Sequence, residues 1–132
     1  MILLDTHAFV WFVSGADREL SAAADTAIKA EVSGGLLAVS SISVWEIAML
    51  AACHRIRLDR PLDQWLAKCE SLPFVKFIPV DNAIAVRSVG LPPPLHKDPA
   101  DRIIAATSLA LDIPLVTKDR RLREYVPVAT IW

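Results

Sequence analysis

The sequence has little cysteine and no pattern of zinc ligands. Its two cysteines, Cys53 and Cys69, are expected to be reduced core or helix residues, because a chain of this length needs no covalent staple. No pair of its three histidines has the spacing of zinc ligands. These absences exclude a disulfide-stapled scaffold and a histidine-based zinc site.

Long apolar runs and a charge excess are also missing. The longest apolar runs, Ala8 to Val13 and Ile47 to Cys53, fall far short of the roughly 20 residues that a bilayer requires. Asp5 interrupts the first apolar run and no basic residue precedes it, so a signal peptide is excluded and a cytoplasmic chain is expected. A net charge of −1 excludes a polycation that holds nucleic acid by bulk electrostatics.

What the chain does contain is apolar material in quantity. Its composition is 54% hydrophobic and 22% charged, with a mean hydropathy of +0.41, which is more apolar than an average soluble domain. The 132 residues predict one domain, residues 1–132, that buries about two-thirds of its unfolded surface. This composition is typical of strands buried on both faces of a sheet.

Segments of strand type alternate with segments of helix type along the whole chain. The expected strands are 2–4, 36–40, 75–80, 115–117 and 128–132. The expected helices are 6–14, 19–33, about 43–54, 61–70, 81–89 and 99–111. The order predicts an α/β fold, a three-layer α/β/α sandwich with a mainly parallel sheet of roughly five strands.

Four carboxylates fall where strands end or helices begin. Asp5 follows the first strand, Asp119 follows Leu115-Val116-Thr117-Lys118, Glu46 lies in Val44-Trp45-Glu46-Ile47, and Asp101 lies in Asp98-Pro99-Ala100-Asp101. In an open parallel sheet such side chains gather in a crevice beyond the carboxyl ends of the strands. Carboxylates gathered without cysteine form a site for a hard divalent cation.

Each acidic residue also has a local structural interpretation. Asp5 can cap the helix that follows it, and Asp98, followed by Pro99, has the signature of a helix start. Ser41 or Ser43 can cap the helix that contains Glu46, and Ser43 and Glu46 have the spacing of a capping box. Asp119 suits a turn. Each acid taken alone can be a cap, a turn residue or a ligand, but the four carboxylates together favour a shared site.

Four motifs in this order resemble those of PIN-domain proteins, in particular the VapC toxins of bacterial toxin–antitoxin pairs. They are Leu4-Asp5-Thr6-His7, Val44-Trp45-Glu46-Ile47, His96 through Ala106, and Val116-Thr117-Lys118-Asp119. The resemblance covers essentially the whole chain. It implies an endoribonuclease that needs Mg²⁺ or Mn²⁺, forms a homodimer and is inhibited by a small antitoxin.

The resemblance also implies roles for individual residues. It assigns the catalytic, metal-binding acids to Asp5, Glu46, Asp101 and Asp119, with polar support from Thr6 and Thr117. Asp98 lies one helical turn before the matched position and is either a supporting residue or only a cap. A rival interpretation of the start of this chain is a phosphatase of the haloacid-dehalogenase type, which also begins with a strand followed by Asp. Such phosphatases need a second Asp two residues on, and His7 at that position argues against their aspartyl-phosphate mechanism.

Basic and aromatic residues admit two interpretations. Lys97, Arg102, Lys118, Arg120 and Arg121 lie beside the acids and are expected either to form a solvated face or to hold RNA phosphates. The four tryptophans favour core or interface packing over base stacking. Helix 61–70, with the loop that follows it, is expected to contact the antitoxin or a dimer partner. The alternative to an enzyme is a non-catalytic PIN-like scaffold that binds RNA or a partner and uses its acids as helix caps.

Overall fold

The computed structural model describes residues 1–132 as strands alternating with helices, as expected. The strands are β1 (Ile2–Leu4), β2 (Leu37–Ser40), β3 (Val75–Ile78), β4 (Leu115–Val116) and β5 (Thr130–Ile131). The helices are α1 (Thr6–Ser14), α2 (Ala22–Gly34), α3 (Ser41–Ala52), α4 (Leu62–Glu70), α5 (Asn82–Val89), α6 (Pro99–Leu111) and α7 (Arg120–Arg123), with a 3₁₀ turn, η1, at Asp17–Glu19.

The five strands form one sheet in the order β3-β2-β1-β4-β5. Every pair is parallel, with Leu3 opposite Ala38 on one side and Leu115 on the other. Because β1 is central and all strands point the same way, the segments that follow β1, β2 and β4 leave the sheet at the same edge.

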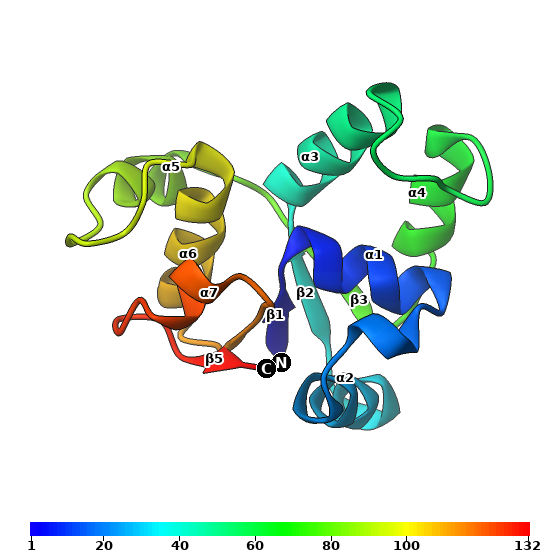
Figure 1. Ribbon diagram of the computed structural model, residues 1–132, viewed down its shortest axis with the longest axis horizontal. Coiled ribbons are helices and arrows are strands. Elements are labelled where there is room, and N and C mark those ends of the chain that lie inside the picture. The colour runs from blue at the N-terminus through cyan, green and yellow to red at the C-terminus, as the bar shows by residue number, and fades with distance from the viewer.

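Alternate residues of the strands supply two separate cores. Ile2 and Leu4 pack with residues of α1, α2 and α4, whereas Leu3 packs with residues of α5, α6 and α7. Figure 1 shows the sheet between these two helical layers. The parallel α/β sandwich predicted from the sequence is therefore confirmed.

Helix α3 begins differently from the prediction. Its N-cap is Ser40, whose hydroxyl accepts from the backbone N–H of Ile42, and the helix starts at Ser41. The predicted Ser43–Glu46 capping box is wrong, since Ser43 lies inside the helix and is buried. The side chain of Glu46 is consequently free of any capping role.

Several smaller expectations also have an outcome. Both cysteines are free, as predicted, with Cys69 in a core and Cys53 exposed. Trp65 packs in a core at 3% exposure. Trp45 is 57% exposed, so core packing is wrong for it, and packing at an interface stays a prediction. None of the helices combines the length and the apolar character needed to span a bilayer.

Candidate functional site

The acidic residues singled out from the sequence line one cavity. Its volume is about 480 Å³, and its wall includes Asp5, Glu46, Asp98, Asp101 and Asp119. The other lining residues are Thr6, His7, Met49, Leu50, Arg55, Ile56, Ile104 and Arg121. We call this cavity the carboxylate crevice. Its acids come from α1, α3, α6 and α7 or their caps, at the carboxyl edge of the sheet.

Asp5 is the most buried acid of the crevice, at 8% exposure. Its Oδ1 accepts the backbone N–H of Ala8 at 2.7 Å, which caps α1, and its Oδ2 accepts the hydroxyl of Thr117. Burial raises the pKa of Asp5 above its ordinary value, and the hydrogen bonds from Thr117 and Ala8 offset only part of that rise. Asp5 is thus a cap and a poorly solvated acid together.

Glu46 enters the crevice from the first half of α3. The hydroxyl of Thr6 donates to its Oε1 at 2.6 Å and lies 2.9 Å from the hydroxyl of Ser43. Burial raises the pKa of Glu46, and the charges of Asp101 and Asp98 raise it further. Among basic side chains, His7 contributes a charge that acts to lower this pKa, but burial and the two acids outweigh it.

Asp101 lies in the first turn of α6, where its carboxylate meets an imidazole. Nε2 of His96 is 2.6 Å from its Oδ2, and Nη2 of Arg121 is 3.7 Å from the same oxygen. Burial raises the pKa of Asp101, and repulsion from Asp98 and Asp119 adds to the rise despite the His96 contact. Its Oδ1 has no protein partner, which leaves that oxygen available to a ligand.

Asp119 is the acid that the protein itself neutralises best. It caps the short helix α7 by accepting the backbone N–H of Arg121 at 2.7 Å, and Nη2 of Arg121 lies 3.0 Å from its Oδ2. Burial acts to raise the pKa of Asp119, but the hydrogen bonds and charge of Arg121 outweigh it, so the pKa lies below its ordinary value.

The supporting residues lie beside these acids. Thr6 and Thr117 are buried and each donates to a crevice carboxylate. Thr117 also accepts the backbone N–H of Asp119 at 3.0 Å, so its hydroxyl joins two of the acids. Asp98 is exposed and caps α6, because its Oδ1 accepts the N–H of Asp101 at 3.1 Å.

Only one of the five predicted basic contacts, Arg121, lines the crevice. Lys97 and Arg102 line a different cavity, and the Arg102 guanidinium donates to the backbone carbonyls of Ser88, Val89, Leu95 and His96. Lys118 lies 3.8 Å from Glu19 and over the ring of Trp11. Arg120 pairs with Glu124 at 2.6 Å. The structure therefore does not bring these four together around the acids.

Arg55 and Ser43 belong to the site but were not predicted to do so from the sequence. Arg55, exposed in the loop after α3, lines the crevice and forms no ion pair. Its position depends on how that loop folds back, which no local pattern indicates. Ser43, which contacts Thr6, could have been found, because it lies three residues before Glu46 and therefore on the same helix face.

The donor set suits a hard divalent cation, but its present arrangement does not form a complete coordination site. Oxygen ligands and the absence of cysteine match the preference of Mg²⁺ and Mn²⁺. Burial raises the pKa of three of these acids, a cost that a bound cation would relieve. However, no three acidic, histidine or cysteine side chains are grouped closely enough to hold one ion. Several oxygens are instead turned toward Thr6, Thr117, His96 and Arg121.

Known proteins resemble this chain over nearly all its length. The PIN domain family model matches residues 2–126. Ribonuclease VapC22 of Mycobacterium tuberculosis is 40% identical over 134 aligned positions, which cover 99% of this chain and 98% of that protein. A toxin-antitoxin complex from Klebsiella pneumoniae contains a chain that is 26% identical, with a TM-score of 0.67 and coverage of 98% and 97%. VapBC2 from Rickettsia felis, bound to a DNA fragment from its promoter, has a chain with a TM-score of 0.66 at 16% identity and the same coverage.

Proposed function

The chain belongs to the PIN domain family, and we propose that it is a metal-dependent endoribonuclease, the toxin of a toxin–antitoxin pair that acts on RNA in the cytoplasm. The observation that carries the proposal is that Asp5, Glu46, Asp101 and Asp119, from four separate elements, line one crevice at the carboxyl edge of a parallel sheet. The 40% identity to a protein named as a ribonuclease supports the same activity.

Mg²⁺ or Mn²⁺ would be held by these four carboxylates, and when bound it would supply an activated water and neutralise charge on the phosphoryl oxygens. Thr6 and Thr117 hold two of the acids in fixed orientations by donating to Glu46 and Asp5. His96 does the same for Asp101, since it engages Oδ2 and leaves Oδ1 facing a ligand. Arg55 and Arg121 are the basic side chains in the wall, so we assign to them contact with RNA phosphates.

The test is cleavage of total RNA by the purified chain, freed of any partner, in Mg²⁺ or Mn²⁺. We expect EDTA and Asp101→Asn each to abolish cleavage. Asp63→Asn, an exposed acid of α4 outside the crevice, is the matched control and should cleave as the unaltered chain does. Cleavage that survives both EDTA and Asp101→Asn would rule out the proposed chemistry.

A specific observation favours one alternative, a non-catalytic scaffold that binds RNA or a partner. Asp5, Asp98 and Asp119 all serve as helix N-caps, and no three donors are grouped for one ion. If the chain neither cleaves RNA nor binds Mn²⁺ in calorimetry, the acids are caps and the scaffold is the better description.

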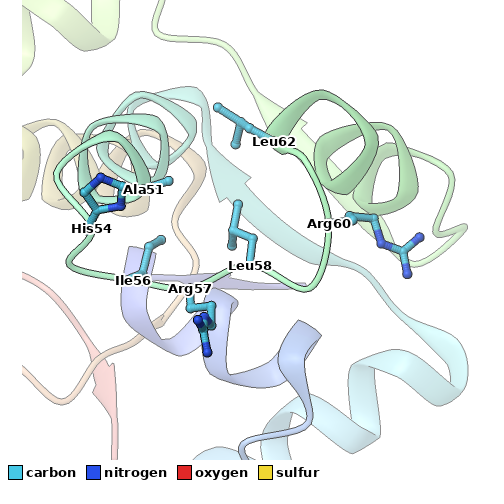
Figure 2. A pocket seen from close by; sticks show the side chains of 7 residues that line it. All are labelled: Ala51, His54, Ile56, Arg57, Leu58, Arg60 and Leu62. Atoms are coloured by element: carbon cyan, nitrogen blue, oxygen red, sulfur yellow. The ribbon is translucent and has the colours of Figure 1, made fainter.

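We further propose that the antitoxin covers the cavity drawn in Figure 2. This cavity, of about 410 Å³, is formed by the end of α3, the loop after it and the start of α4, with Ile56, Leu58 and Leu62 among apolar lining residues and Arg57 and Arg60 among basic ones. Ile56 also lines the carboxylate crevice, so a partner seated here would lie next to the acids.

The proposal includes a homodimer of this single PIN-like unit. Two valines of α5, Val86 and Val89, are 75% and 80% exposed, which is unusual for apolar side chains on a short helix and suits burial between copies. Light scattering on the purified chain should give twice the monomer mass. A monomer at all accessible concentrations would remove the dimer from the proposal.

A further inference from the structure

We infer that Arg121 sets the affinity of the carboxylate crevice for a divalent cation, because its guanidinium already lies between the two acids that such a cation would share. The inference rests on the proposed metal-dependent function. Nη2 of Arg121 is 3.0 Å from Oδ2 of Asp119 and 3.7 Å from Oδ2 of Asp101. Arg121 is therefore a counterion that the chain supplies to its own acidic site.

The contacts of Arg121 are one reason why the coordination site is incomplete, because they occupy both oxygens of Asp119. Its Nε and Nη2 engage both carboxylate oxygens of Asp119, at 3.4 and 3.0 Å, and a planar guanidinium is suited to such a forked contact. Its charge also acts on Asp98, the remaining acid of this side of the crevice. While the guanidinium holds this position, an incoming cation must compete for the oxygens of Asp119 and Asp101.

The position of Arg121 also makes the exchange feasible. Its side chain is 60% exposed, whereas those of Asp101 and Asp119 are 19% and 27% exposed. Arg121 therefore has room to swing toward solvent or a phosphate, while the acids stay in place. Arginine remains charged throughout the accessible pH range, so the competition persists at every working pH.

Arg120 offers a matched control on the same short helix. It pairs with Glu124 and lines a separate cavity with Arg123, Thr130 and Trp132. Replacing Arg120 removes the same charge from the chain as replacing Arg121, but it leaves the contacts inside the crevice intact. The two variants thus separate a local contact from a change in net charge.

The experiment is titration of Mn²⁺ into the metal-stripped full chain by calorimetry at low ionic strength. Arg121→Gln should bind Mn²⁺ roughly five- to tenfold tighter than the unaltered chain, and Arg120→Gln should stay within about twofold. The gain should shrink as salt is added, because screening weakens the competing pairs. In nitrogen NMR, the side-chain Nε–H signal of Arg121, assigned by its loss in Arg121→Gln, should move as Mg²⁺ is added.

The possible failures separate the two proposals. Unchanged or weaker Mn²⁺ binding by Arg121→Gln, or an equal gain in both arginine variants, would overturn the role of Arg121. The proposed function would survive the failure of the Arg121 inference if the unaltered chain binds Mn²⁺ and Asp101→Asn does not. If neither the unaltered chain nor Arg121→Gln binds Mn²⁺, the metal-dependent function and the inference built on it both fail.

Discussion

Replacing Asp98 separates a helix cap from a metal ligand, two roles that its position allows. Its carboxylate lines the crevice, but its one hydrogen bond goes to the backbone N–H of Asp101. We expect Asp98→Ala to lose the cap at a cost of about 1 kcal/mol. In a chain of 132 residues this corresponds to a melting temperature lower by roughly 3 to 5 °C.

Asp98→Asn should keep the cap, because the amide oxygen accepts the same N–H, and its melting temperature should match that of the unaltered chain. The variant loses one exposed negative charge, so Mn²⁺ should bind only about two- to fivefold more weakly. Without that charge, the repulsion that raises the pKa of Glu46 and Asp101 is reduced, so both pKa values should fall. Metal binding should then begin at a lower pH.

The assays are thermal unfolding in EDTA and calorimetric titration with Mn²⁺, with Asp101→Asn as the reference for a lost ligand. We expect Asp101→Asn to weaken binding by about a hundredfold or more. If Asp98→Asn weakened binding as severely as Asp101→Asn while keeping its melting temperature, Asp98 would be a ligand and our reasoning from its single hydrogen bond would be wrong.

Three further changes test other parts of the site. Thr117→Val removes a hydroxyl that lowers the pKa of Asp5, so Mn²⁺ binding measured against pH should begin at a higher pH than in the unaltered chain. The control is Thr107→Val, whose hydroxyl bonds only within α6 and which should leave that pH unchanged. Because the pKa of Glu46 is raised on folding, the chain loses stability as pH rises from about 4.5 through that pKa. Urea unfolding in EDTA should therefore show Glu46→Gln to be more stable than the unaltered chain at pH 7. Equal free energies of unfolding near pH 4 would support this mechanism, and a difference that stays constant with pH would contradict it. Arg102→Lys should lower the free energy of unfolding by about 1 to 3 kcal/mol, because it breaks contacts with backbone carbonyls. If the variant stays folded but binds RNA more weakly, Arg102 would belong to the RNA-binding surface after all.

The fold was predictable because its strands and helices are marked locally. Short apolar strands alternate with helices that carry their own caps, and the helix Pro99–Leu111 was predicted with the bounds that the structure gives. The capping box at Ser43 failed because Ser40, three residues earlier, is an equally good cap and is the last residue of β2. A run of serines leaves the choice of cap to tertiary contacts, here the packing of Ser43 against Thr6.

The crevice was predictable in its acids but not in its cations. A carboxylate placed at or just beyond the end of a parallel strand is carried to the sheet edge by topology. Asp5 directly follows β1, and Asp119 comes three residues after β4. A long basic side chain can turn in several directions from the same backbone position. Arg102 turns to backbone carbonyls and Arg121 turns to carboxylates, although each lies within two residues of an acid in the sequence. Arg55 reaches the crevice from a loop with no marker at all.

The hydrogen bond from Thr117 to Asp5 joins residues 112 positions apart. It forms only after β4 has paired with β1, so the first acid of the site waits for nearly the whole chain to be synthesised. During translation the N-terminal part leaves the ribosome first, at roughly 5–20 residues per second, with Asp5 and Glu46 but without Asp101 or Asp119. A chain synthesised only as far as β3 therefore carries Asp5 and Glu46 without Asp101 and Asp119, so the crevice lacks two of its four acids until α6 and the start of α7 have been made.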